Sequence, residues 1–469
     1  MDDSTIRREG PGQNPYAPPL TTDLPKKGEL SLVDTTSIIV GIIIGAVVFQ
    51  SAPKIAASLP NLGWLLVAWL AGGFIAWLGA LCYAEWGTRC PDGGGDYHYL
   101  RRAFGPHVAW VFGWMQLLVI RPGSLGFFAL AFGKYAQELV PLALPHPLLC
   151  YAIAALALST LVNLCGLREG LLAQRILTTA KVLGLLLVIV VGCLVAVLVD
   201  ARPLNFEVAP QQEFAPGLAM ILILYAYGGW NEVGYLAGEV RNARRTIPRT
   251  LGWGLAVVAV LYALLNLAYA VGLGWIPFQH STSPAAEVLA IPFGAAGVTA
   301  MHIMLCVTLF GALHGSLITG ARLTAAFVND TAQQWQTHAT LNLDDAANHP
   351  TWSAYLIEFG ISLVALLVVG WEGDPEALII FASPPFWLGL LLVGGGLLRI
   401  RRASTTTDDA TIYRVPCYPW TVLLFMATCL WMTWSSFVYA KDNLTEVAWG
   451  VGAIFLIGIG LSFMGKKRN

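Results

Sequence analysis

Apolar stretches of about 20 residues or more recur along the whole chain. Each is long enough to cross the hydrocarbon core of a bilayer as a helix, which satisfies its own backbone hydrogen bonds in lipid. We therefore predict an all-α membrane protein with twelve transmembrane helices. The predicted ranges are 33–57, 61–86, 106–137, 147–167, 170–199, 215–239, 249–273, 291–328, 352–371, 374–399, 416–439 and 446–465. The third and eighth look too long for one crossing, which indicates strong tilt or an extension beyond the bilayer.

Charged residues are too few to cover a soluble surface. They make up 12% of the 469 residues, and 56% of the residues are apolar, whereas a soluble domain carries about 25% charged residues. This composition excludes a soluble enzyme, a disordered protein and a nucleic-acid-binding protein. The eight cysteines are scattered without a C-x-x-C pair, and we interpret them as small membrane hydrophobes.

The basic residues fall mainly in alternate connecting segments. With the N-terminus placed in the cytoplasm, 21 of the 27 lysines and arginines lie inside and only Arg202 and Lys441 lie outside. Basic loops resist translocation, so both termini are predicted to be cytoplasmic. The protein itself is predicted to lie in the plasma membrane or bacterial inner membrane. Residues 1–32 and 466–469 are expected to form cytoplasmic tails, the first of them flexible. The basic segment 238–249 is interpreted as a cytoplasmic gate or anchor, or simply as an orientation signal.

Glycines interrupt two spans in a way that the others do not show. The first span contains Gly41 and Gly45, and the sixth contains Gly228 and Gly229. Alone, such a pair is also typical of helix packing or of a simple kink. Their matched positions favour two five-span halves of inverted topology, with a substrate site between paired broken helices. The predicted organisation is a first repeat over 33–199, a second over 215–402 and peripheral spans over 416–465.

Six motif groups occur in order along residues 33–330. They read Gly41-Ile42-Ile43-Ile44-Gly45-Ala46, Tyr83-Ala84-Glu85 with Gly93-Gly94-Gly95-Asp96-Tyr97, Ala103-Phe104-Gly105-Pro106, Ile120-Arg121-Pro122-Gly123-Ser124, Ala226-Tyr227-Gly228-Gly229-Trp230-Asn231, and Gly315-Ser316-Leu317 with Arg322-Leu323. Together they resemble the L-type amino acid transporters of the amino acid, polyamine and organocation superfamily, of a bacterial type without a heavy chain. The last third resembles them mainly in hydropathy and in Arg414-Val415-Pro416.

That resemblance implies a ten-helix, LeuT-like core with two peripheral helices, and sodium-independent amino acid transport by alternating access. It places the substrate carboxylate on the backbone amides of Gly45, Ala46 and Val47, and the ammonium on carbonyls near Ile42 and Ile43. A half-helix start suits an anion and a half-helix end suits a cation. The family usually has glycine where this chain has Val47, so we expect a restricted or shifted pocket.

The sixth span supplies the other predicted substrate contacts, Tyr225, Gly228, Trp230, Asn231 and Glu232. Tyr225 is expected to close over the substrate, although an aromatic there also suits simple packing. Trp230 and Asn231 either line the cavity or serve a structural role. Glu232 is costly in a membrane unless it is paired or hydrated. It is expected to bind an ammonium, accept a coupling proton or pair with a neighbouring cation.

Lys181 is the most informative charge within the spans. The resemblance implies that its ammonium replaces a sodium ion, reaching carbonyls of the first break and the hydroxyls of Ser316 and Thr319. The alternative is a lysine that extends to the membrane surface. Arg121, beside Pro122, is interpreted as a structural brace, and His314 as a hydrogen-bonded histidine at a helix contact or as a pH-sensitive group.

No enzyme motif is apparent. A nucleotide-binding G-x-x-x-x-G-K-[ST] loop, an H-E-x-x-H zinc motif and a G-x-S-x-G elbow are all missing from the sequence. We expect no cofactor, no metal and no nucleic acid, and, because 138–147 lacks cysteine, no disulfide-linked heavy chain. The predicted function is exchange or proton-linked uptake of neutral or small amino acids. The alternatives are cationic amino acid or polyamine transport, or a non-transporting sensor with the same fold.

Overall fold

The computed structural model describes residues 30–45, 47–90, 95–165, 167–198, 214–335, 352–371, 373–403, 412–443 and 445–464. Each predicted span coincides with a helix or an interrupted run of helices in these residues. The first half contains α1 (Leu32–Ile43), α2 (Val47–Gln50), α3 (Ala52–Ala57), α4 (Leu62–Arg89), α5 (Gly95–Phe104), α6 (Pro106–Met115), η1 (Gln116–Ile120), α7 (Arg121–Leu139), α8 (Pro147–Cys165) and α9 (Leu167–Leu198). The rest contains α10 (Pro216–Ala226), η2 (Trp230–Glu232), α11 (Val233–Leu236), η3 (Ala237–Glu239), α12 (Ala243–Leu273), α13 (Trp275–His280), α14 (Pro284–Trp335), α15 (Trp352–Val368), α16 (Pro375–Ala403), α17 (Trp420–Asn443) and α18 (Thr445–Met464).

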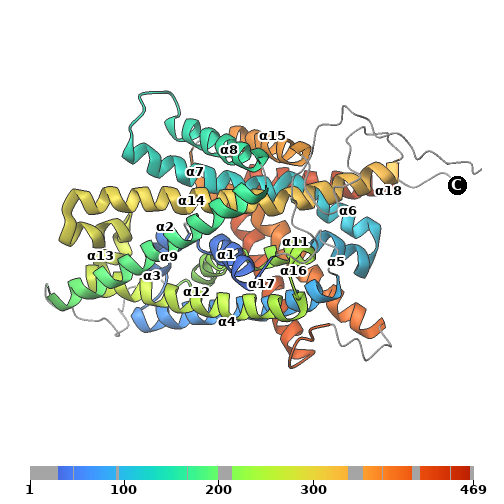
Figure 1. The fold of residues 1–469 in the computed structure, drawn as a ribbon, viewed down its shortest axis with the longest axis horizontal. Coiled ribbons are helices and arrows are strands. Elements are labelled where there is room, and N and C mark those ends of the chain that lie inside the picture. The colour runs from blue at the N-terminus through green and yellow to red at the C-terminus, as the bar shows by residue number, and fades with distance from the viewer. Residues whose placement is uncertain are drawn as a thin grey trace, which may run out of the picture.

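The all-α membrane fold is confirmed. Among the described residues, nine helices are long and apolar enough to cross a membrane, and two shorter apolar helices accompany them. Figure 1 shows α4, α12 and α14 running along the long axis, with α1 between them. Helix α1 packs against α9, α12 and α14, and most of its residues are buried. The first broken helix therefore lies at the centre of the bundle.

The two over-long predicted spans differ in structure. Helix α14 is 52 residues long and bends at Gly294, near its start, so most of the predicted span 291–328 lies in one continuous helix beyond that bend. The run from Pro106 to Leu139 contains a π-helical turn, η1, and the next helix, α7, has Pro122 in its first turn. Such a turn and a proline both interrupt regular helical hydrogen bonding and reorient the chain.

The start of α1 is fixed by local hydrogen bonds. The Ser31 hydroxyl accepts from the backbone N–H of Asp34, and the Asp34 carboxylate accepts from the backbone N–H of Ser31. This reciprocal cap satisfies amides that the first helical turn leaves unpaired. Leu30 then forms a short parallel bridge with Val240. This bridge ties the beginning of the first broken helix to the end of the sixth run, which we define as the interrupted series of helices from α10 to η3.

Both predicted interruptions are present. The chain leaves helical geometry after Ile43, and again after Ala226. Gly229 has a φ of +107°, and a Cβ there would come within 2.7 Å of the side chain of Ile42. Only glycine fits this position, because it accepts positive φ and lets the two breaks approach each other.

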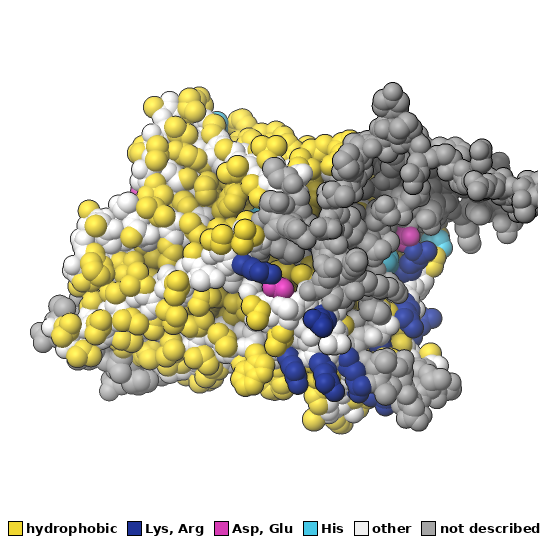
Figure 2. Space-filling model, viewed as in Figure 1, with side chains coloured by type: hydrophobic (Ala, Val, Ile, Leu, Met, Phe, Trp, Pro, Cys, Tyr) yellow, Lys and Arg dark blue, Asp and Glu magenta, His cyan; other side chains and the backbone are white. Residues whose placement is uncertain are grey.

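Basic and apolar side chains are separated on the surface. Figure 2 shows apolar groups over most of the visible face and Lys and Arg gathered toward one end. We call the end of the bundle that carries Arg244, Arg245 and Arg249, at the start of α12, the basic end. Exposed apolar residues such as Leu183 and Trp253 are typical of a lipid-facing surface.

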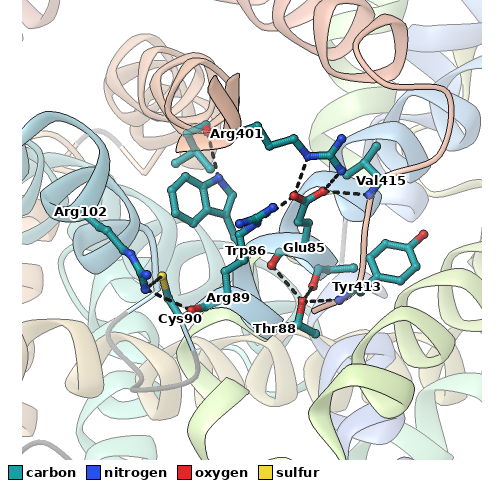
Figure 3. A network of polar contacts seen from close by, with 11 residues as sticks. Glu85, Trp86, Thr88, Arg89, Cys90, Arg102, Arg401, Tyr413 and Val415 are labelled. Carbon is teal, nitrogen blue, oxygen red and sulfur yellow. Dashed lines mark hydrogen bonds and ion pairs between the residues drawn. The ribbon is translucent and has the colours of Figure 1, made fainter. Parts of the chain in front are cut away.

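A buried carboxylate joins α4 to the C-terminal third (Figure 3). Glu85 is fully buried and accepts from the guanidinium groups of Arg89 and Arg401 and from the backbone N–H of Val415, at 2.8 Å. Its oxygens thus receive several charge-assisted or backbone hydrogen bonds, which offset the cost of burial. Two motifs far apart in the sequence, Tyr83-Ala84-Glu85 and Arg414-Val415-Pro416, meet at this point.

Candidate functional site

One cavity lies between the two helix breaks. The predicted site residues that line it are Ile42, Ile43, Gly45, Val47, Tyr225, Gly228, Asn231, Glu232 and Ser316. Ala46 lies outside the described residues. The first and sixth runs contribute most of this set, so the structure places the cavity where paired broken helices are expected to hold a substrate.

Other lining residues were not among the predicted substrate contacts, although Arg121 and Ser124 belong to the Ile120–Ser124 motif. Helix α7 and the π-helical turn before it contribute Gln116, Arg121 and Ser124, and α16 contributes Ser383 and Phe386. Ser383 directly precedes two prolines inside an apolar run, and that combination could have drawn attention to it. Gln116 and Phe386 are ordinary polar and aromatic residues in predicted spans.

The backbone of the breaks is already partly hydrogen-bonded. The Tyr262 hydroxyl donates to the carbonyl of Ile43, at 3.0 Å, and to that of Ala226, at 3.3 Å, and so bridges the two breaks. The N–H of Gly45 donates to the Ile43 carbonyl at 2.8 Å. A carboxylate on Gly45 or an ammonium on Ile43 would therefore compete with a bond that the protein makes here.

Val47 and Tyr225 separate this cavity from a second one. The second cavity lies toward α3, away from the basic end, and includes Gln50 and Lys54. Both Val47 and Tyr225 line the two cavities, and the Tyr225 ring packs edge-on against Phe127 with centroids 6.0 Å apart. These side chains thus form a thin partition between two cavities arranged in series.

Lys181 reaches the first broken helix. Its ammonium, fully buried on α9, donates to the carbonyl of Gly41 at 2.7 Å. The side chain passes Gly311 of α14, where an added Cβ would come 2.8 Å from Lys181 Cε. It does not extend to the surface. Ser316 lines the cavity, and the Thr319 hydroxyl contacts Arg121.

Arg121 and Glu232 form a buried ion pair at the cavity wall. The Arg121 Nη2–Glu232 Oε2 distance is 3.1 Å, and Arg121 Nη1 donates to Thr319 Oγ1 at 3.3 Å. The guanidinium lies over the Tyr235 ring, 5.0 Å from its centroid. Among the roles left open for Glu232, pairing with a cation is the one that the structure shows. Arg121 braces α7 against the sixth run and also lines the cavity.

Trp230 and His314 are placed away from the cavity lining. The Trp230 ring packs edge-on against Tyr83, with centroids 5.2 Å apart, and against Phe425. His314 is fully buried on α14, with Nδ1 3.0 Å from the side-chain nitrogen of Asn163 on α8. The Trp230 ring thus packs against α4 and α17, and His314 is a hydrogen-bonded histidine at a helix contact.

Two ion pairs lie between the cavity and the basic end. Arg322 on α14 binds both carboxylate oxygens of Glu239 on η3, at 2.8 and 3.1 Å. Arg175 on α9 pairs with Asp34 on α1. One pair joins the start of the first run to α9, and the other joins the last residues of the sixth run to α14. Together they hold the first and sixth runs against α9 and α14 on this side of the cavity.

Asp96 is a buried acid outside the candidate spans, at the start of α5. Its side chain is 2% exposed, and Tyr235 donates to Oδ2 at 3.2 Å. Burial raises the pKa of this carboxyl to about 7, and the negative charge of Glu232 acts in the same direction. Arg121 acts in the opposite direction. Asp96 is therefore linked through Tyr235 to the ion pair at the cavity.

We expect the stability of the folded protein to fall as pH rises from about 4 to about 7 because of Asp96. Over this interval the unfolded chain loses the proton while the folded chain retains it, so raising the pH favours unfolding. Asp96→Asn should remove this part of the pH dependence. The melting temperatures of both proteins at pH 5 and pH 8 check it, and an equal change in both would contradict the assignment.

Comparisons with known proteins agree with this architecture. The model of the amino acid permease family matches residues 30–461. The human b(0,+)-type amino acid transporter 1 is 30% identical over 409 residues, which cover 84% of this chain and 80% of the relative. The human cystine/glutamate transporter is 28% identical over 423 residues, covering 88% and 81%.

The human large neutral amino acids transporter small subunit 2 is 32% identical over 313 residues, covering 63% of this chain and 57% of the relative. These relatives are transporters rather than enzymes, and the family model spans both broken runs and the helices around the cavity. A cavity between two interrupted helices, inside an all-α bundle, is the arrangement in which many secondary transporters bind their substrate. The chain therefore belongs to the amino acid permease family and, within it, to the L-type amino acid transporters.

Proposed function

We propose that this protein transports neutral or small amino acids without sodium, by exchange or by proton-linked uptake. The observation that carries the proposal is the Lys181 ammonium, 2.7 Å from the Gly41 carbonyl at the first break. A fixed cation beside this carbonyl occupies the kind of site where a transporter would otherwise bind a mobile cation. Transport of large neutral amino acids by one relative, as its name states, supports the substrate class.

The basic end is proposed to face the cytoplasm. The charge asymmetry of the connecting segments supports this orientation. In this arrangement the Glu239–Arg322 and Asp34–Arg175 pairs close the cytoplasmic side, and Val47 with Tyr225 closes the outer side. Alternating access then requires one closure to open while the other remains closed. We also propose that the chain is built from two five-helix halves of inverted topology. It is proposed to work without a disulfide-linked heavy chain.

Substrate is proposed to bind between the breaks. Its carboxylate would lie at the start of α2, near Gly45, Ala46 and Val47, and its ammonium near the carbonyls that end α1 and α10. The ammonium would take the place of the Tyr262 hydroxyl at one of the two carbonyls that this hydroxyl contacts, Ile43 or Ala226. Because Glu232 is already paired with Arg121, the geometry favours a neutral substrate side chain over a cationic one.

A substrate panel tests this assignment. Purified protein in sodium-free liposomes preloaded with unlabelled alanine, serine and leucine should take up the same labelled amino acids by counterflow. Unlabelled glutamate, lysine and putrescine, added outside in separate assays, should compete weakly. Strong competition by lysine or putrescine would instead support the cationic class, and no counterflow with any amino acid would support the non-transporting alternative.

Val47→Gly should enlarge the range of accepted substrates. The valine side chain is 5% exposed and narrows the partition between the two cavities. Removing an apolar group of this size typically changes discrimination between substrates by about tenfold or more. We therefore expect uptake of tryptophan to rise relative to alanine. Val48→Ala, at a fully buried neighbour, is the matched control, and an unchanged ratio in Val47→Gly would show that Val47 does not limit the pocket.

A further inference from the structure

A buried acid on α15 has no part in the proposed substrate site. Glu358 is 2% exposed, and the Thr324 hydroxyl of α14 donates to its Oε1 at 2.9 Å. Within the part of the chain that the structure describes, Oε2 has no hydrogen-bond partner. An ionised carboxylate in such surroundings is costly, since a single neutral hydroxyl replaces its hydration shell.

Helix α14 is shaped to accept this carboxyl. A Cβ on Gly320 would come within 2.5–2.9 Å of the two oxygens and the carboxyl carbon of Glu358. The glycine therefore leaves a notch in which the acid lies directly against the helix backbone. Thr319, the preceding residue, accepts a hydrogen bond from Arg121, and Ser316, one turn earlier, lines the substrate cavity. A single stretch of α14 thus contacts Glu358, the buried ion pair and the cavity.

The charges around Glu358 do not balance if every acid is ionised. Arg121 on α7 and Glu232 on η2 both lie within electrostatic range of Glu358, and they already pair with each other. Arg322 on α14 is paired with Glu239. Tyr355 lies on the same helix as Glu358, one turn away, and interacts with it as well. Among the described elements that pack most closely on α15, α8 and η1 carry no acidic or basic residue.

We propose that Glu358 is the proton-binding site of this transporter. The proposal rests on the proposed transport function and selects proton-linked uptake within it. In the conformation described here the carboxyl is protonated: one carboxylate oxygen has taken a proton from water, leaving the local charge carried by the Arg121–Glu232 pair. When the transporter opens to the cytoplasm, Glu358 releases this proton to the water there.

The protonation state of Glu358 can change the charge at the substrate cavity through Arg121. Once ionised, Glu358 competes with Glu232 for the single guanidinium of Arg121, because a buried carboxylate gains most from a charged partner. Movement of Arg121 toward α15 would release Glu232, which lies at the second break and lines the cavity. Loading and unloading of the proton thereby change the charge that the substrate meets.

The test compares three proteins in sodium-free liposomes with the membrane potential clamped. Wild type, Glu358→Gln and the control Glu446→Gln, an exposed acid on α18, take up labelled alanine, serine and leucine. Uptake is measured with and without an inward gradient of two pH units, and a trapped dye reports proton entry. One coupled proton allows at most ~100-fold accumulation under this gradient.

We expect wild type and Glu446→Gln to accumulate substrate above the external concentration and to admit protons when substrate is added. Glu358→Gln should lose both responses. It should still show measurable counterflow, because in exchange the transporter crosses the membrane with substrate bound in both directions and needs no net proton movement. Glu358→Asp should restore gradient-driven uptake with a shifted pH dependence, which covers the case in which the glutamine variant fails to fold.

Two results would overturn the proposal. One is counterflow by wild type without substrate-triggered proton entry, and the other is gradient-driven accumulation retained in Glu358→Gln. Absence of counterflow in wild type is a different outcome, since it contradicts the proposed transport function itself.

Discussion

Lys181→Ala is expected to reduce sodium-free transport by about tenfold to a hundredfold while leaving insertion intact. The substitution removes a buried ammonium that donates to the Gly41 carbonyl at 2.7 Å. A hydrogen bond from a charged donor contributes about 1.5–3 kcal/mol, and each 1.4 kcal/mol is tenfold in rate or affinity. Because Gly41 lies in the first broken helix, the loss should appear in transport rather than in stability.

Initial rates of labelled amino acid counterflow, normalised to the amount of reconstituted protein, measure this effect. Lys441→Ala, at the exposed end of α17, is the matched control and should transport like wild type. A monodisperse size-exclusion peak for both variants confirms folding. Near-normal sodium-free transport by Lys181→Ala would remove the basis for the fixed-cation proposal.

Separating Arg121 from Glu232 is expected to have the largest effect on stability. Removal of one partner from a buried ion pair typically costs about 3–5 kcal/mol, because the other charge remains buried alone. Arg121→Met and Glu232→Gln should each lower the melting temperature in detergent and reduce transport at least about tenfold. Arg121→Met should be the more damaging, since Arg121 also donates to Thr319 and lies over Tyr235.

The double variant Arg121→Met with Glu232→Gln provides the decisive comparison. With both charges removed, no unpaired charge remains, so the loss of stability should be smaller than the sum of the two single losses. Additive losses would show that the two side chains act independently. Transport should remain low in the double variant, because both residues line the proposed substrate cavity.

The helices and the two breaks could be predicted because physical constraints make them visible in the sequence. A span must be apolar over its full length to lie in lipid. A break needs glycine where two backbones approach, as at Gly229 beside Ile42. The family resemblance added Lys181, whose position after two threonines gives no geometric clue by itself.

The partners of the buried charges could not be predicted in the same way. Arg121 and Glu232 are 111 residues apart and meet only after the bundle is packed. Glu358 lies in an otherwise ordinary apolar span, and its notch at Gly320 depends on the rotation of α14 against α15. Tyr262 likewise bridges the two breaks from a helix whose sequence pattern indicates only a membrane span.

Counterflow in the complete absence of sodium tests the central claim most directly. Liposomes containing the purified protein are loaded with unlabelled alanine, serine and leucine, and labelled forms are added outside in choline medium. Saturable uptake that is unchanged when sodium replaces choline is the result predicted here. Uptake that appears only with sodium would contradict the role proposed for Lys181, and a lack of uptake in both media would contradict amino acid transport by this cavity.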